Sequence, residues 1–318
     1  AADGEETGEE TGEFQLKNPE IDPDRVGIWD CVYFGSYPQS SDGNGGFVTE
    51  PIKWRVLRLT DTDGDGVDDD AFLMADRNLD AKQYHSNVDS VRTWENCELR
   101  SWLNSDSEDG FYGKAFNEAE KEAIKLSSIV SGATYRVSTE DKVFLLSIPD
   151  MNNQADGFFY KFYEHDTRKA MSTDYTRSRG GEVTPTGHGK YWLRARGLAG
   201  VDNETGYVQA DGAFQEYGGV KVNGTDYGVR PVLHLDLTKE VWSYAGIVKS
   251  DGTVINAPTE VNVYETLAYT GNEIKPETVV KYGDTVLEKG TDYNIIGYKN
   301  NVDVGTATVT IEGTGAST

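Results

Sequence analysis

The sequence is poor in basic residues and in cysteine, and it contains no long apolar run. Its 30 lysines and arginines face 54 acids, which gives a net charge of −24. A nucleic-acid partner would need a basic surface for its phosphates, and an anionic membrane would need a polybasic segment. No apolar run approaches the about 18 residues of a membrane span. We therefore exclude nucleic-acid binding and direct lipid binding, and we expect a neutral or cationic ligand.

Motifs of catalysis are also missing. The four histidines lack the spacing of zinc ligands on one element. The sequence contains no Gly-x-Ser-x-Gly turn and no phosphate-binding Gly-Lys loop. Carboxylate pairs are too common among 54 acids to indicate a glycosidase. These absences favour a protein that is not an enzyme.

The two cysteines, Cys31 and Cys97, are too few for a disulfide scaffold. They are compatible with two buried thiols. They are equally compatible with a single bridge that ties the first strand to the start of a helix. The sequence leaves both interpretations open.

The chain begins AADGEE without Met, as a mature chain does after removal of a signal peptide. We therefore expect an exported, extracellular or cell-surface protein. Residues 1–24 are acidic with almost no apolar side chains, so they predict a disordered leader. Residues 25–256 would form the main domain. Residues 257–318 hold short Thr-, Val- and Tyr-rich runs broken by Gly and Asn, which predict a small all-β sandwich.

Local patterns predict the elements of the main domain. Branched residues in 52–59 and apolar residues in 71–76 predict a hairpin. Helical spacing of apolar residues predicts a helix in 94–104 with Asn96 as its cap, and a capping box at Asn117 predicts a second helix through about residue 128. The remaining expectations are a short strand that ends in a Gly/Pro turn (31–39), a buried strand (142–148) and a short helix within 157–171.

The hairpin connection DTDGDGVDDD (residues 61–70) is the sharpest chemical signal. Ca²⁺ prefers several oxygen ligands, which Asp61, Asp63, Asp65, the Val67 carbonyl and Asp69 would supply around the tight turn at Gly66. The bidentate Glu of calcium loops is absent, because Phe72 occupies the twelfth position, and Asp70 is a candidate substitute. We expect a structural Ca²⁺ that neutralises the cluster. The alternative is an acidic turn that stays hydrated.

Residues 191–235 join two buried-looking runs through a Gly- and aromatic-rich middle, a composition typical of binding loops on a rigid scaffold. The candidate ligand contacts are the loop aromatics Tyr207, Phe214, Tyr217 and Tyr227. Alternatively, these rings pack down on the domain. Trp192, Arg194 and Arg230 are better explained as parts of the core.

Six motifs in order carry a resemblance to a known family: FGSYPQ (34–39), IKWRVL (52–57), WENCELRSWLN (94–104), DKVFLLS (141–147), YWLRARG (191–197) and GVRPVLHLDL (228–237). Residues 25–252 resemble bacterial extracellular domains of unassigned function found in surface proteins of Gram-positive gut bacteria. The resemblance implies an α+β, C-type-lectin-like fold related to formylglycine-generating enzymes, with two or three helices around twisted antiparallel sheets. The tail resembles bacterial Ig-like repeats through LAYTG (267–271), LEKGTDYNI (287–295) and VGTATVTIEGTG (304–315).

The chain departs from the family pattern at the start of the loop-rich stretch. It has Tyr191 where the family usually has Trp, and Ala195-Arg196 where the family has Ser-Pro. An Arg at a loop entrance changes backbone freedom and surface charge, so we include Arg196 among the candidate ligand contacts.

These features together predict a monomeric adhesion or recognition module at the cell surface. It would bind a glycan, or a host or bacterial surface protein, through the loops of the lectin-like domain, carried on an Ig-like stalk. One alternative is a binding protein diversified by a retroelement. Another is an enzyme of the formylglycine-generating type, which would need a reactive cysteine pair near the C-terminal part of the fold, whereas Cys31 and Cys97 lie upstream.

Overall fold

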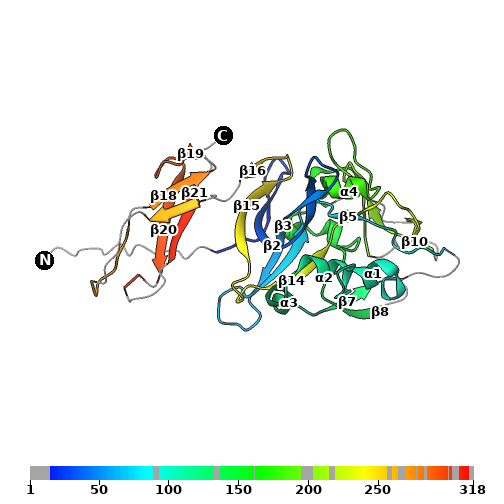
Figure 1. Ribbon diagram of the computed structural model, residues 1–318, viewed down its shortest axis with the longest axis horizontal. Helices are drawn as coiled ribbons and strands as arrows, with labels where there is room; N and C mark the ends of the chain where they lie inside the picture. The colour runs from blue at the N-terminus through cyan, green and yellow to red at the C-terminus, as the bar shows by residue number, and fades with distance from the viewer. Residues whose placement is uncertain are drawn as a thin grey trace. The chain divides into compact units, whose positions relative to one another are not determined.

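The computed structural model divides the chain into two compact units, and Lys17–Val254 is the larger one (Figure 1). The structure describes residues 15–88, 93–131, 137–160, 162–194, 203–214, 219–255, 260–263, 270–276, 278–282, 285–299, 301–302 and 308–314. The chain is mostly β with a few short helices, in keeping with the α+β class. Within these residues no helix has the length and apolar character needed to cross a membrane.

The boundaries of the larger unit differ at one end from the prediction. Its C-terminal limit, Val254, lies close to the predicted 256, but its N-terminal limit is Lys17. Strand β1 (Glu20–Ile21) pairs with β2 (Gly27–Ser41) in the register Glu20 to Ile28. The prediction of a disordered leader is therefore wrong for residues 17–24, which are part of the fold.

An eight-stranded sheet forms the frame of the larger unit. Its order is β16-β15-β2-β3-β4-β14-β6, with β1 on β2. The further strands are β3 (Phe47–Thr60), β4 (Asp70–Ala75), β6 (Ile124–Lys125), β14 (Val232–Asp236), β15 (Ser243–Lys249) and β16 (Val254–Ile255). The predicted hairpin is confirmed as β3 and β4. Strand β4 lies between β3 and β14 and every residue in it is buried, which explains its unbroken apolar run.

Strand β2 is longer than the sequence predicts. It continues through Pro38, which lies beside a register shift against β3, so the predicted Gly/Pro turn is wrong. A second shift coincides with Gly35, whose φ is +66°. A Cβ at Gly35 would lie 2.5 Å from the Phe116 ring, so only glycine allows this close approach.

The helices are short and lie beside the large sheet (Figure 1). They are η1 (Trp94–Asn96), α1 (Glu98–Leu103), α2 (Phe111–Ala115), α3 (Glu118–Ala123) and α4 (Asp174–Ser178). Helix α1 is capped by Cys97 and not by Asn96. The capping box at Asn117 is confirmed, but α3 ends at Ala123, because the next two residues form β6 and pair with β14. Strands β7 (Ser127–Ser131) and β8 (Val137–Asp141) follow as a hairpin.

Two further sequence expectations are wrong. Residues 142–148 are largely buried, but they join the sheet only through a bridge between Phe144 and Val232. The segment 157–171 contains a single turn of 3-10 helix, η4 (Asp166–Arg168), in place of the predicted helix. The 3-10 turns η2 (Asp150–Asn152) and η3 (Gln154–Asp156) precede it.

A smaller sheet organises the predicted binding stretch. Its order is β11-β9-β13-β5, from β5 (Asp80–Ala81), β9 (Tyr191–Trp192), β11 (Tyr207–Val208) and β13 (Gly228–Val229). The pair β10 (Glu204–Thr205) and β12 (Val220–Lys221) lies within the same stretch.

Four tryptophans anchor the core, and each buried indole N–H donates a hydrogen bond. The acceptors are the Asp156 carbonyl for Trp29 (3.0 Å), the Phe34 carbonyl for Trp54 (2.7 Å), the Asp141 carboxylate for Trp94 (2.8 Å) and the Lys82 carbonyl for Trp192 (2.8 Å). A buried indole needs such a partner, since an unmade hydrogen bond costs about 1–3 kcal/mol. The four rings therefore tie neighbouring strands and turns of the core together.

The smaller unit consists of strands in the part that the structure describes. Strands β17 (Glu260–Val263), β18 (Thr278–Tyr282) and β19 (Thr285–Val286) form one sheet, and β20 (Tyr293–Lys299) and β21 (Thr308–Gly313) form another. The buried Tyr293 hydroxyl donates to the Thr278 carbonyl (3.1 Å) and so connects the two sheets. The expected all-β character holds for these residues.

Candidate functional site

The aromatic residues predicted to reach solvent from residues 191–235 are largely packed inward. Tyr227 is 8% exposed and stacks on Trp192, with ring centroids 3.9 Å apart. Half-buried Tyr207 meets Tyr227 edge-on at 5.4 Å. Phe214 is 2% exposed. The prediction of solvent-facing contacts is therefore wrong for Phe214 and Tyr227, because stacking and burial of their rings are more favourable than exposure to water.

Two other predicted contacts, Arg196 and Tyr217, lie outside the described residues. Lys190 also covers the Tyr227 ring, with its ammonium 4.3 Å from the centroid, and pairs with Asp226 (2.6 Å). Trp192, Arg194 and Arg230 have the structural roles expected of them. Arg230, for example, is buried and donates to the main-chain carbonyl of Ala75 (2.8 Å).

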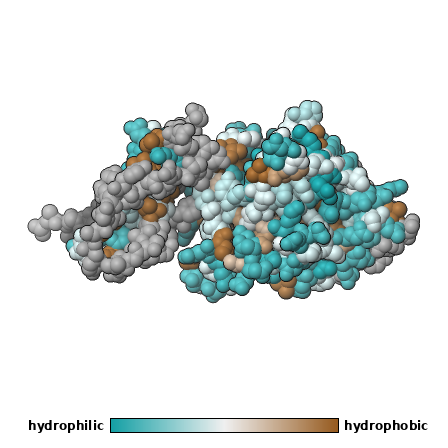
Figure 2. All heavy atoms as spheres, viewed as in Figure 1, coloured by the Kyte–Doolittle hydropathy of each residue, from teal (hydrophilic) through white to brown (hydrophobic). Residues whose placement is uncertain are grey.

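The exposed aromatic surface lies elsewhere, in the segment FFYKFY (residues 158–163), here named the aromatic segment. Tyr160, Phe162 and Tyr163 are 60%, 44% and 61% exposed. Among the side chains that the structure describes, no other aromatic one is exposed. On the face shown in Figure 2, hydrophilic residues dominate the larger unit and hydrophobic ones form separate spots. Three neighbouring exposed rings are therefore an exception on this surface.

A buried arginine holds the main chain of the aromatic segment. Arg168 is fully buried, and its guanidinium donates to the carbonyl oxygens of Phe159 (2.6 Å), Gly212 (2.7 Å) and Tyr163. The same guanidinium lies over the Phe214 ring at 5.1 Å. The carbonyls of Phe159 and Tyr163 lie near the two ends of the aromatic segment, and Arg168 binds both. A single side chain therefore holds the two ends of the segment together.

The segment is also anchored by the main chain of Phe214 and by its own first ring. The Phe214 amide donates to the Phe162 carbonyl (3.1 Å), and Phe158 is buried against Trp29. Gly212 lies against the main chain of His165: its φ is +85°, and an added Cβ would collide with the His165 carbonyl, so only glycine allows this close approach. Residues 212–214 of the predicted binding stretch thus hold the main chain that carries the exposed rings.

Sequence reasoning placed this segment in a short helix and missed its exposure. The available signal was the density of five aromatic residues within six positions. Their spacing fits neither one face of a helix nor one face of a strand. Such a run cannot bury all its rings on one side of the chain, so some of them face solvent.

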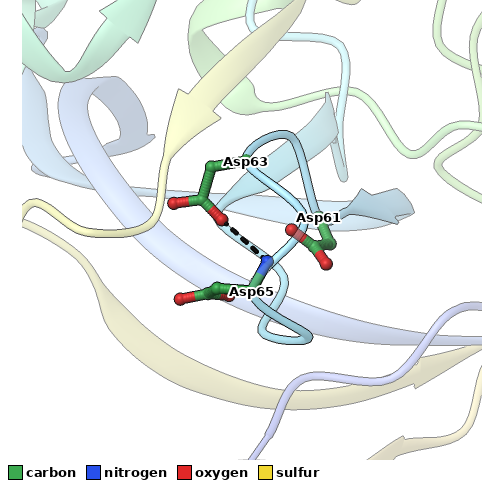
Figure 3. A group of neighbouring side chains, drawn as sticks. All are labelled: Asp61, Asp63 and Asp65. Atoms are coloured by element: carbon green, nitrogen blue, oxygen red, sulfur yellow. Dashed lines mark hydrogen bonds between the residues drawn. The ribbon is translucent and has the colours of Figure 1, made fainter.

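The acidic loop after β3 brings three carboxylates together (Figure 3). One oxygen from each of Asp61, Asp63 and Asp65 lies within 4.8 Å of the others. The Asp61 carboxylate accepts the amides of Gly66 (2.8 Å) and Gly64 (2.6 Å), and these bonds lower its pKa. Oxygen ligands on a preformed turn suit a hard cation such as Ca²⁺.

The other two carboxylates of the expected calcium loop have partners in the protein. Asp69 accepts from the amide and hydroxyl of Thr62 (both 2.8 Å). Asp70 is buried and pairs with His234 (2.8 Å) and Lys125 (3.3 Å), so it does not replace the missing Glu. The Val67 amide donates to Asp65 (2.8 Å), which shapes the turn. The structure therefore offers three carboxylates to a cation and not a full seven-oxygen loop.

The two cysteines are free and buried, so the interpretation as two thiols is confirmed and the disulfide alternative is wrong. Burial raises the pKa of both thiols, that of Cys97 to about 12. A thiol nucleophile needs the opposite, an accessible sulfur with a lowered pKa. Neither cysteine is suited to covalent chemistry.

Comparison with known proteins gives one family match. Residues 68–237, slightly more than half of the chain, match the family described as Domain of unknown function (DUF6273). No curated protein and no solved structure matches the chain. The matched range contains the aromatic segment, Arg168 and the small sheet that organises residues 191–229. The chain belongs to the DUF6273 family.

Proposed function

We propose that this protein is a cell-surface recognition module that binds a ligand on another surface and catalyses no reaction. The ligand, a glycan or a host or bacterial surface protein, contacts the aromatic segment. The observation that carries the proposal is the grouping of Tyr160, Phe162 and Tyr163, the exposed aromatic side chains of the described residues, on one segment held by Arg168.

Exposed rings on a fixed main chain favour binding for two reasons. Each large ring that a ligand covers is removed from water, and aromatic anchors of this kind are each worth about 2 kcal/mol or more in an interface. Because Arg168 and Phe214 already fix the loop, little backbone freedom is lost on binding. The buried, high-pKa thiols support a role without covalent catalysis.

The proposed context is extracellular. The main unit would have a C-type-lectin-like arrangement, the smaller one an Ig-like fold that serves as a stalk, and the protein would be exported and monomeric. A Ca²⁺ bound by Asp61, Asp63 and Asp65 would have a structural role, because it would neutralise three neighbouring carboxylates on the β3–β4 connection. Diversification by a retroelement would concern residues 191–235, of which 195–202 and 215–218 lie outside the described ranges.

The test compares two matched variants of the full chain. The first is Tyr160→Ala, Phe162→Ala, Tyr163→Ala. The control is Leu126→Ala, Val130→Ala, which removes exposed apolar surface elsewhere on the same unit, since these residues are 60% and 50% exposed.

Labelled wild-type protein and both variants are screened on arrays of glycans and of cell-surface proteins. We expect the triple variant to bind at least thirtyfold more weakly than wild type, about 2 kcal/mol, with an unchanged Tm. The control should bind normally. Equal binding by wild type and the triple variant would place the site outside the aromatic segment.

A further inference from the structure

We propose that the aromatic segment is a stacking surface for an uncharged polysaccharide. This inference rests on the proposed function and specifies its ligand. The observations that carry it are the arrangement of the three rings, their rigid support, the small extent of the apolar surface and the charge around it.

Two of the exposed rings lie against each other and offer one continuous apolar surface. The centroids of Phe162 and Tyr163 are 4.5 Å apart and their planes are inclined by 39°, so together they form a bent apolar surface. Tyr160 adds a third exposed ring from the same segment. A pyranose has an apolar face of C–H groups, which an exposed aromatic ring removes from water.

Rigid support matters more for a sugar than for a protein partner. Each ring covered by a sugar contributes a small area, so binding is measurable only when the rings need not be ordered first. Arg168 donates to the carbonyls of Phe159 and Tyr163, on either side of Tyr160 and Phe162. The ring of Phe159 is itself fixed by stacking on His165, with centroids 4.4 Å apart.

The extent of the apolar surface favours a sugar over a protein. A stable protein interface uses about 20–30 residues and about 800 Å² on each side. Here the exposed rings are confined to six positions, and exposed carboxylates, those of Glu164 and Asp211, lie on the adjoining loop residues. Carboxylates accept hydrogen bonds from hydroxyl groups, which every sugar carries along the edge of its ring.

The net charge of −24 disfavours acidic polysaccharides. Glu164 and Asp211 are exposed beside the rings. Among the residues that the structure describes, the cations nearest to the segment are Arg168, which is buried beneath it, and Arg25, which lies over the Phe159 ring. Sulfated and uronic-acid polymers would be repelled at long range and would place anions beside carboxylates. An uncharged chain has no such cost.

The experiment uses the full chain with insoluble cellulose and chitin, with soluble cello- and chito-oligosaccharides, and with heparin as a polyanion. The variants are Tyr160→Ala, Phe162→Ala, Tyr163→Ala, the Phe-substituted pair Tyr160→Phe, Tyr163→Phe, and the control Leu126→Ala, Val130→Ala. Retention on the polymers and calorimetric titration with the oligosaccharides measure the affinity.

We expect binding to at least one uncharged polysaccharide and none to heparin. The affinity should fall at least thirtyfold in the alanine variant, and less than fivefold in the phenylalanine pair and the control, since the rings and not the hydroxyls carry the stacking. It should change less than twofold between low and high salt.

Two outcomes would overturn the inference, and they separate it from the proposed function. If the array of cell-surface proteins shows binding that depends on the three rings while no polysaccharide is bound, the ligand class is wrong and the recognition site stands. If no probe shows binding that depends on the rings, both proposals fail.

Discussion

Arg168 is the side chain on which the geometry of the aromatic segment depends most. Its substitution by Met keeps an unbranched apolar chain in the buried site and removes the guanidinium. Three main-chain carbonyls, those of Phe159, Tyr163 and Gly212, then lose their donor. Because the charge disappears as well, the cost of burying a cation disappears with it.

The size of the effect follows from these opposing terms. An orphaned buried acceptor costs about 1–3 kcal/mol, so three carbonyls cost about 3–9 kcal/mol. The variant avoids the cost of burying a guanidinium, which offsets several kcal/mol. The free energy of unfolding should therefore fall by about 3 kcal/mol. With a urea m-value of about 3 kcal/mol per M for a unit of this size, the unfolding midpoint should fall by about 1 M.

Urea unfolding of the full chain, followed by tryptophan fluorescence, measures this shift. Trp29 contacts Phe158 at the start of the segment, so the signal reports on this region. The matched control is Arg177→Met, which removes an exposed arginine on α4 and should change stability by less than about 0.5 kcal/mol. If Arg168→Met shifts the midpoint no more than the control does, the guanidinium does not hold the loop, and the account of a preformed site is wrong.

The other predictions concern the metal, the thiols and alkaline pH. Asp61→Asn with Asp65→Asn should abolish any rise in Tm caused by millimolar Ca²⁺; a rise that persists would locate the ion elsewhere. Cys31 and Cys97 should be inert to a thiol reagent at neutral pH in the native protein and react fully in concentrated urea, because both are buried with raised pKa values; rapid reaction of the native protein would contradict this. Burial and the neighbouring Asp80 raise the pKa of Tyr37, so its contribution to stability is complete below the pKa of an unfolded tyrosine, about 10, and is lost as the pH rises above it. The free energy of unfolding should therefore fall steeply above about pH 10, and less steeply in Tyr37→Phe, in urea titrations across that range; an equal slope in the two proteins would refute the assignment.

The elements that depend only on residues close together in the sequence could be predicted. The β3–β4 hairpin and the Asn117 capping box depend on neighbouring residues, and both formed as predicted. The end of α3 could not be predicted in this way, since it is set by the pairing of Ile124 with Leu235, more than a hundred positions along the chain. The same holds for Pro38, which lies in a strand beside a bulge that accommodates it.

The candidate site shows more directly what the sequence alone could not predict. Tyr227 and Tyr160 look alike in a sequence, as tyrosines in loops. Their exposure is decided by what covers them: Trp192 stacks on Tyr227, whereas Tyr160 is 60% exposed. The residue that fixes the exposed rings, Arg168, lies in a stretch without a recognisable motif. Composition could therefore indicate an aromatic binding surface but could not indicate which aromatic residues form it.

The position of the chain ends in the larger unit has a mechanical consequence. Lys17 donates from its amide to Asp30 near the start of β2 (2.8 Å), and Lys249 at the end of β15 pairs with Ile28. Entry and exit thus lie at the same end of two antiparallel strands. A force that pulls them apart would first detach the two-residue strands β1 and β16, and would then open the β2–β15 ladder one hydrogen bond at a time. If the smaller unit serves as the stalk, tension carried through β15 would open the sheet from this edge and would reach Trp29 of β2, which packs on Phe158 at the start of the aromatic segment.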